Sequence, residues 1–198
     1  MIDSNLKELI YNYQELEKVF NESQMEEILF GLQQKLDITK YVDIKYNTMQ
    51  MIQIRYGLEK DLNVSVYADP KYIWEQMEQI REGLEDKLDI TVYADTKYNA
   101  MQMWQIREGL LYKTDVSLYA NPKYDWGQMQ EIRWGLEKGL DVTIYADSKY
   151  NWQQMRQIRY GLEYGLDVAQ YADVKYDCEQ MEEIKEQLLA EKEEKQNE

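Results

Sequence analysis

Five arginines recur along the chain at intervals of 26 residues, at Arg55, Arg81, Arg107, Arg133 and Arg159. A row of guanidinium groups could bind an anionic ligand such as a phosphate backbone. In four of the repeats, however, a glutamate follows four positions after the arginine, at Glu59, Glu85, Glu137 and Glu163. On a helix this spacing brings the two side chains together, so we expect ion pairs within the chain rather than a binding row.

Tyrosine recurs with the same step, at Tyr46, Tyr72, Tyr98, Tyr124, Tyr150 and Tyr176. Aromatic side chains in a row can stack single-stranded bases. A residue that is identical in every repeat and lies on the packed side of a helix is more typical of a core, and tyrosine is a large core side chain with a polar tip. We therefore expect this tyrosine row to be buried.

A third set of positions changes from repeat to repeat and forms an i, i+4 ridge opposite the unvarying positions. All five tryptophans of the chain lie on it. The aromatic and cationic ridge residues are Trp74, Trp104, Tyr112, Trp126, Trp134, Trp152, Arg156, Tyr160 and Tyr164. Exposed Trp, Tyr and Arg are enriched at binding hot spots, which predicts a partner-binding surface. The alternative is that contacts between helices bury the tryptophan at the first ridge position.

The sequence offers little for catalysis. It has no histidine, which removes the usual general base and the commonest metal ligand, and it has no glycine-rich phosphate loop. Carboxylates are plentiful, but they follow the repeat as caps and ion-pair partners. The single cysteine, Cys178, occupies a ridge position and is expected to fill space. We therefore predict no enzyme activity, no catalytic residues, no cofactor and no metal.

These residues lie in a repeat of 26 residues. The pair Gln-Met occurs seven times, beginning at residues 24, 50, 76, 102, 128, 154 and 180. A repeat held this strictly is the signature of a solenoid, because one unit cannot bury its apolar stripe alone. The predicted fold is an all-α solenoid in which each repeat is one long helix plus one short helix.

In the repeat that begins at Asp69, this aspartate is expected to cap the long helix and Pro70 to be its first residue. The helix is expected to end near residue 86 or 87. Gly139 and Gly165 fit a left-handed C-terminal residue in two repeats. Asp89 then caps a short second helix over residues 90–94, with an extended segment as the alternative because the composition is rich in β-formers.

Glycine also recurs inside the predicted long helices, at Gly57, Gly83, Gly109, Gly135 and Gly161. Glycine in a helix interior costs about 1 kcal/mol relative to alanine. We expect these glycines to let neighbouring helices approach closely.

The ends of the array differ from its middle. Residues 1–20 keep an amphipathic pattern without the repeat motifs and are predicted to form an N-terminal cap helix. The solenoid spans residues 21–188, and residues 189–198 are predicted to fray into an acidic tail.

The chain of 198 residues carries 38 acidic and 23 basic residues, a formal net charge of −15. This balance argues against a surface that clamps nucleic acid or anionic lipid. No stretch is long and apolar enough to span a membrane, the N-terminal residues do not resemble a signal peptide, and one cysteine is typical of a reducing compartment. We expect a cytoplasmic protein.

The string Tyr-Ala-Asp-x-Lys-Tyr-x-Trp-x-Gln-Met-x-x-Ile-Arg-x-Gly-Leu-Glu-x-Gly-Leu-Asp-Val, complete at residues 145–168, resembles a tandem α-repeat found in proteins of bacterial mobile elements and phages. The likeness covers residues 21–188. The pairing of a long and a short helix is similar to leucine-rich-variant repeats, although their motif differs. The resemblance implies a mobile-element setting and no reaction.

Together these observations favour a non-enzymatic protein-binding scaffold whose partner has a basic surface. Its sharper form is an acidic inhibitor of the anti-CRISPR or anti-restriction type, which blocks the basic groove of a CRISPR effector or restriction enzyme by charge mimicry. The first alternative is a self-associating module, with the ridge forming a homodimer. The second is a nucleic-acid binder that uses aromatic stacking and a local patch of Lys123, Arg133, Lys138, Arg156 and Arg159.

Overall fold

A computed structural model describes residues 14–197 and divides the chain into two compact units, Met1–Ile90 and Thr91–Glu198. All regular structure within the described residues is helical, which confirms the predicted all-α solenoid. Most of the predicted N-terminal cap helix lies outside the described residues; residues 14–16 form a helical turn.

From Glu22 onward, the described part of the first unit contains three α-helices, each followed by a 3₁₀-helix. In chain order these are α2 (Glu22–Gln33), η1 (Ile38–Lys40), α3 (Thr48–Glu59), η2 (Val64–Val66) and α4 (Trp74–Glu85), and η3 (Ile90–Val92) begins at the last residue of the unit.

The second unit repeats this order. Its elements are α5 (Ala100–Leu111), η4 (Val116–Leu118), α6 (Trp126–Glu137), η5 (Val142–Ile144), α7 (Trp152–Glu163), η6 (Val168–Gln170) and α8 (Cys178–Asn197).

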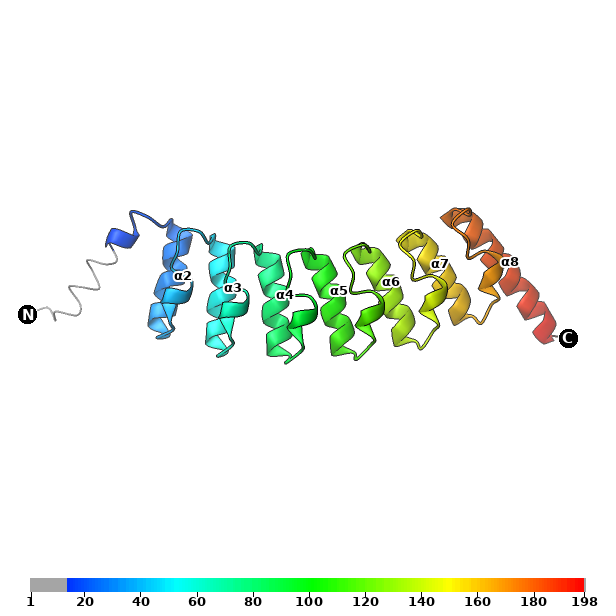
Figure 1. Ribbon diagram of the computed structural model, residues 1–198, viewed down its shortest axis with the longest axis horizontal. Helices are drawn as coiled ribbons and strands as arrows, with labels where there is room; N and C mark the ends of the chain where they lie inside the picture. The colour runs from blue at the N-terminus through cyan, green and yellow to red at the C-terminus, as the bar shows by residue number, and fades with distance from the viewer. Residues whose placement is uncertain (1–13, 198) are drawn as a thin grey trace, which may run out of the picture. The chain divides into compact units, whose positions relative to one another are not determined.

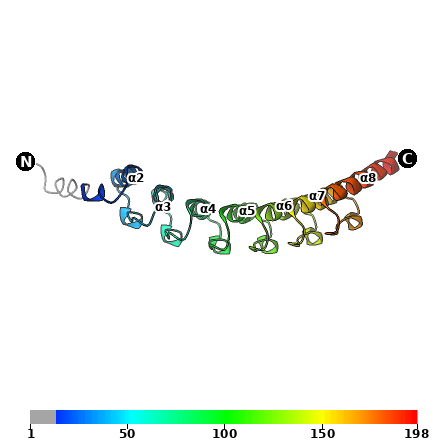
Figure 2. The same ribbon diagram turned by 90° about the horizontal axis from the view of Figure 1, so that it is seen from above.

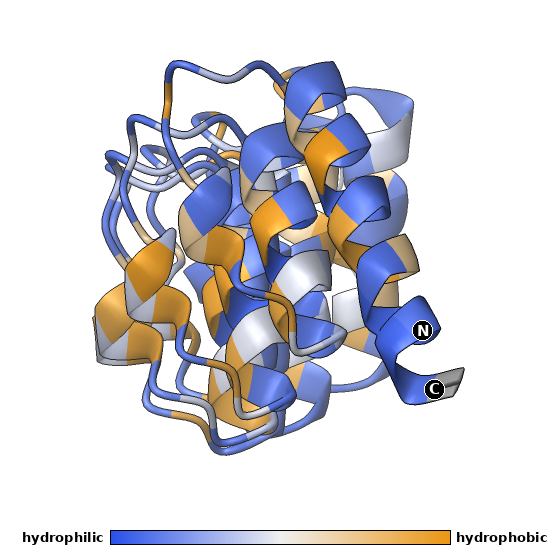
Figure 3. Ribbon diagram, turned by 90° about the vertical axis from the view of Figure 1, so that its right-hand side faces the viewer, coloured by the Kyte–Doolittle hydropathy of each residue, from blue (hydrophilic) through white to orange (hydrophobic). Residues whose placement is uncertain are grey.

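Within each unit the α-helices lie side by side in one layer, and the 3₁₀-helices lie along one side of that layer (Figures 1 and 2). The 3₁₀-helices contain many apolar residues (Figure 3). Neighbouring helices such as α2 and α3, or α6 and α7, pack directly against each other. The predicted short helix is therefore confirmed as a 3₁₀-helix, and the extended alternative is wrong.

The long helices begin later than the sequence analysis placed them. Asp69 does not cap α4; its side chain accepts from the N–H of Lys71 in a turn, and the helix begins at Trp74. In the other repeats an Asn or Asp immediately before the helix forms a capping box with the glutamine of the Gln-Met pair, as Asn99 does with Gln102. Ile73 replaces that capping residue in α4. This repeat therefore lacks the polar capping residue that marks the start of the helix in the others.

The recurrent glutamine also joins successive repeats. Gln102 Oε1 accepts from the N–H of Asn99, and its Nε2 donates to the carbonyl of Tyr124 in the next repeat at 2.6 Å. The same bond links Gln24 to Tyr46 at 2.8 Å and Gln154 to Tyr176 at 2.7 Å. This double use explains why no other residue type occupies the position.

The tyrosine row is confirmed as core over most of its length. Tyr46, Tyr98 and Tyr124 are buried, and each hydroxyl donates to the carbonyl of an alanine in the next repeat. Tyr176 in the last repeat is only partly buried. Stacking of nucleic-acid bases on the buried tyrosines is therefore sterically excluded.

The glycines inside the helices serve a different purpose from the one expected. A Cβ at Gly135 would lie 2.0 Å from Tyr145 Oη, and a Cβ at Gly31 would lie 1.9 Å from Tyr41 Oη. Both tyrosines directly follow a 3₁₀-helix and are fully buried. Tyr41 Oη donates to the carbonyl of Glu27, and Tyr145 Oη donates to the carbonyl of Glu131, one helical turn before the glycine. Burial raises the pKa of Tyr41 to about 12. The glycine makes room for a tyrosine of its own repeat and not for the next helix.

The long helices end close to the predicted position: α4 ends at Glu85, where the prediction was residue 86 or 87. Gly139 and Gly165 have positive φ values of 69° and 62°, as a left-handed terminal residue requires. In the other repeats that have this turn a larger residue adopts the same conformation, for example Lys113 at 60°. The last helix differs, because α8 continues to Asn197 and residues 189–197 extend it instead of forming a separate frayed tail.

No helix within residues 14–197 is long and apolar enough to cross a membrane.

Candidate protein-binding surface

Four of the five recurrent arginines bond to the preceding helix. Arg159 donates within α7 to Glu163, as the sequence predicts, and its Nε donates across to Glu131 of α6 at 2.7 Å. Arg133 makes the same two bonds, to Glu137 and across to Gln105 of α5 at 3.0 Å. Arg55, Arg81, Arg133 and Arg159 are all buried, so these guanidinium groups are unavailable to a ligand.

The residue that accepts from the next helix is either glutamate or glutamine. It is Glu27 opposite Arg55 and Glu131 opposite Arg159, but Gln53 opposite Arg81. The bonds within helices follow from the i, i+4 spacing in four repeats, whereas the bonds between helices were not predicted, because their partners are 28 residues apart.

At the α6–α7 junction the buried ion pair lies beneath two aromatic rings of the ridge. The guanidinium carbon of Arg159 is 5.3 Å from the Trp134 ring centroid and 4.4 Å from that of Tyr160. We name the five residues Glu131, Trp134, Arg159, Tyr160 and Glu163 the second cluster. Burial raises the pKa of Glu131, against the opposing effect of its hydrogen bond from Arg159.

The α2–α3 junction contains a counterpart, the first cluster: Glu27, Phe30, Arg55, Tyr56 and Glu59. The guanidinium carbon of Arg55 is 5.4 Å from the Phe30 centroid and 4.6 Å from that of Tyr56. Phe30 and Tyr56 occupy the ridge positions of Trp134 and Tyr160 but were absent from the predicted surface. Phe30 and Tyr56 lie four repeats of 26 residues before Trp134 and Tyr160, so the repeat alone places them on the ridge.

The nine predicted ridge residues fall in both units. Trp74 belongs to the first, and the other eight belong to the second. None of the nine is buried: Trp126, Trp152, Arg156, Tyr112 and Tyr164 are exposed, and Trp74, Trp104, Trp134 and Tyr160 are partly exposed. Contacts between helices thus leave the tryptophans accessible, including those at the first ridge position.

On α6 and α7 the ridge residues form one face. Trp152 packs on Gly127 of α6, where an added Cβ would lie 3.0 Å from the indole. Arg156 extends over the Tyr160 ring, and its Nη2 donates to Tyr160 Oη at 3.4 Å. This bond lowers the pKa of the Tyr160 hydroxyl. Trp126 and Trp152 remain 44% and 40% exposed, which is unusual for such large apolar side chains.

The predicted basic patch does not assemble. Arg133 and Arg159 are buried, so only Lys123, Lys138 and Arg156 of the five are exposed. Lys138 pairs with Glu163, and the ammonium of Lys123 lies 4.7 Å from the Tyr124 ring centroid.

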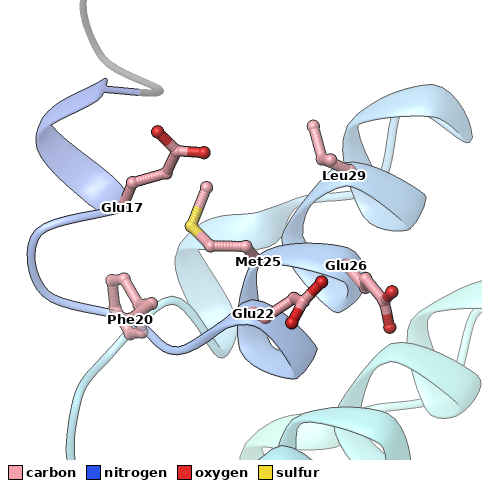
Figure 4. Close-up of a pocket in the computed structure, with 6 residues that line it drawn as sticks. All are labelled: Glu17, Phe20, Glu22, Met25, Glu26 and Leu29. Carbon is pink, nitrogen blue, oxygen red and sulfur yellow. The ribbon is translucent and has the colours of Figure 1, made fainter.

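A hollow of about 460 Å³ lies beside α2 in the first unit (Figure 4). Its lining combines an apolar floor with carboxylates, from Glu17, Phe20, Glu22, Met25, Glu26 and Leu29. Within the described residues, no group of three or more Cys, Asp or Glu side chains is placed to hold a metal ion.

We compared the chain with known protein families, with curated proteins and with solved structures. No family matches it. No curated protein and no solved structure matches it either. The resemblance to repeats of mobile elements stays a prediction.

Proposed function

We propose that this protein is a non-catalytic, protein-binding repeat scaffold that contacts its partner with the α6–α7 ridge. The observation that carries the proposal is the exposure of Trp126, Trp152 and Arg156 on one face, next to the aromatic pair of the second cluster. Tryptophan, tyrosine and arginine that lie together at a surface are the residue types that dominate binding energy in protein interfaces.

The partner that we propose has a basic surface, since the chain carries a net charge of −15. Exposed carboxylates lie on both units, for example Glu22 and Glu26 on α2 and Glu182 and Glu186 on α8. Opposite charge across an interface speeds association and excludes wrong partners. A groove that handles nucleic acid, such as that of a CRISPR effector or restriction enzyme, has this character, and an inhibitor occupying it in the cytoplasm is the sharper form of the proposal.

Direct binding of nucleic acid has less support. Phosphate contacts need free Lys and Arg side chains, but four of the five recurrent arginines are buried and bonded at the junctions between helices. The aromatic row suited to base stacking is mostly in the core.

The test is capture from nuclease-treated bacterial lysate with three forms of the full chain. These are the wild type, the ridge variant Trp126→Ala/Trp152→Ala/Arg156→Ala, and a control, Leu118→Ala/Ile144→Ala, which removes side chains of similar exposure from the 3₁₀-helices. A protein recovered by the wild type is then purified and its Kd is measured with each form, in rising salt. We expect the ridge variant to bind at least ~100-fold more weakly and the control to bind normally.

Equal loss with the control, or no loss with the ridge variant, would contradict the assignment of the surface. Light scattering of the free protein tests the alternative: a dimer that the ridge variant dissociates would assign the ridge to self-association.

A further inference from the structure

In most repeats, three residues in and just before the long helix bond to the repeat that follows. In the repeat of α6 they are Tyr124, Gln128 and Glu131. Tyr124 Oη donates to the carbonyl of Ala146 at 2.6 Å, and Gln128 Nε2 donates to the carbonyl of Tyr150. Glu131 accepts from Arg159, as described above. We call these three positions the forward triad, and all three are buried in the repeat of α6.

The repeat of α8 has the same forward triad, in Tyr176, Gln180 and Glu183. Here no described residue covers it: Gln180 and Glu183 are exposed, and Tyr176 is partly exposed. Gln180 still forms its bonds with Asp177 at the start of the helix, and its Nε2 remains available. Ile184 is partly exposed, whereas the equivalent Ile158 is fully buried.

The opposite face of α8 bonds to the repeat of α7. Lys185 replaces the recurrent arginine and donates to Gln157 of α7 at 2.7 Å. Lys192 donates to the carbonyl of Tyr164 at 2.6 Å, at the C-terminal end of α7. Gln187 stands where other helices have glycine, and α8 runs for 20 residues without the turn that ends the 12-residue helices. Among residues 14–197, the helix is therefore packed on one side and uncovered on the other.

We propose that the open face of α8 binds a basic amphipathic helix of a protein partner, in the register of a following repeat. An Arg or Lys of that helix pairs with Glu183, as Arg159 pairs with Glu131. Carbonyl groups in the turn before the partner's helix accept from Gln180 Nε2 and Tyr176 Oη, and its apolar side chains cover Ile184. Exposed Glu179 and Glu186 on the same helix favour a cationic occupant.

The junctions between repeats are the physical precedent, since the same residue types are covered in this way at the α6–α7 junction. A second copy of this chain fits the face poorly. In α2, the position equivalent to Arg55 and Arg159 is Leu29, so the first described helix lacks the cation that Glu183 requires. This surface is distinct from the α6–α7 ridge, so the two proposals can fail independently.

The experiment adds a labelled peptide to the full chain and measures fluorescence anisotropy. The peptide is residues 145–166 of this protein, because that segment supplies Ala146, Tyr150 and Arg159 to the forward triad of α6. We expect saturable binding, with amide hydrogen exchange slowed in α8. Glu183→Lys should weaken binding at least ~10-fold, and Arg159→Glu in the peptide should do the same. Combining these two changes should restore binding.

Glu193→Lys is the matched control, because it makes the same charge change at an exposed position of α8. It should leave the affinity within about twofold of the wild type, and so should the ridge variant Trp126→Ala/Trp152→Ala/Arg156→Ala. Absence of binding, or binding that Glu183→Lys and Glu193→Lys weaken equally, would overturn the inference. If the captured partner requires the ridge while the peptide does not bind, the proposed function stands and this inference falls.

Discussion

The α2–α3 and α6–α7 junctions are built from the same buried parts but have different surroundings. Both pair a glutamate with an arginine 28 residues later and place two aromatic rings beside the guanidinium group. Around the first cluster the ridge carries the carboxylates of Glu22 and Glu26, whereas around the second it carries tryptophan and Arg156. The buried contacts thus follow from helix packing, while the exposed positions beside them are free to differ. This freedom is what a binding surface requires.

The two clusters also differ in depth. The side chains of Arg159 and Glu131 are 4% and 2% exposed, against 9% and 10% for Arg55 and Glu27. A buried charge that loses its partner is destabilised more strongly in the drier site. The second cluster should therefore be the more sensitive of the two.

The largest expected effect comes from removing the cation. Arg159→Met leaves Glu131 buried without its partner and should lower the free energy of unfolding of the second unit by about 4 kcal/mol. Arg55→Met should cost the first unit less. Urea titration together with hydrogen exchange resolved by segment measures both changes. Arg156→Met, on the exposed ridge, is the control and should change stability by less than ~0.5 kcal/mol. Equal losses from Arg159→Met and Arg55→Met would refute the difference in depth.

A substitution outside the two clusters should lower the stability of both units by the same amount. Gly31→Ala and Gly135→Ala each force a methyl group against a buried tyrosine hydroxyl, at almost the same distance in the two units. Each should cost about 2 kcal/mol in the same urea titration. Removing that hydroxyl with Tyr145→Phe should recover most of the loss from Gly135→Ala. Tyr145→Phe should not recover the stability lost in Gly139→Ala, because nothing lies near that added methyl group and the strain comes from the positive φ.

The smallest expected effect is a gain. Glu131→Gln converts the second cluster to the Gln105–Arg133 arrangement and keeps an acceptor for the Arg159 Nε–H. Because burial raises the folded-state pKa of Glu131, folding destabilises its ionised form relative to the unfolded chain. The variant should be more stable by about 1 kcal/mol at pH 7.

This advantage should shrink as the pH falls. A carboxyl group whose pKa is raised in the folded state destabilises the protein at high pH, and this destabilisation disappears below its unfolded pKa of about 4.3. The wild type therefore regains stability on acidification, whereas Glu131→Gln has no carboxyl group to titrate at this position. Chemical denaturation of both proteins at pH 7 and near pH 4.5 measures the difference. An advantage that grows on acidification would show that the ion pair, and not its burial, dominates the site.

The repeat made most of the fold predictable. The seven Gln-Met pairs, the alternation of long and short helices and the left-handed glycines at 139 and 165 all follow from spacing and local conformational preference. The start of the helices was harder to predict, because Asp69 and Pro70 fit a helix N-terminus as well as Ile73 and Trp74, where α4 begins. The ridge was identified by its variation, and the structure adds that its nine predicted residues are all accessible.

Residue spacing alone predicts the period, the helical class, the ion pairs within four of the helices and the face that varies. These depend on contacts between residues only a few positions apart, where helical geometry leaves little choice. Packing between repeats decides that Arg159 bonds to Glu131, that Gly135 makes room for Tyr145, and that no described residue covers Tyr176, Gln180 and Glu183. Such pairings depend on how one repeat packs against the next, and composition and periodicity do not specify that packing.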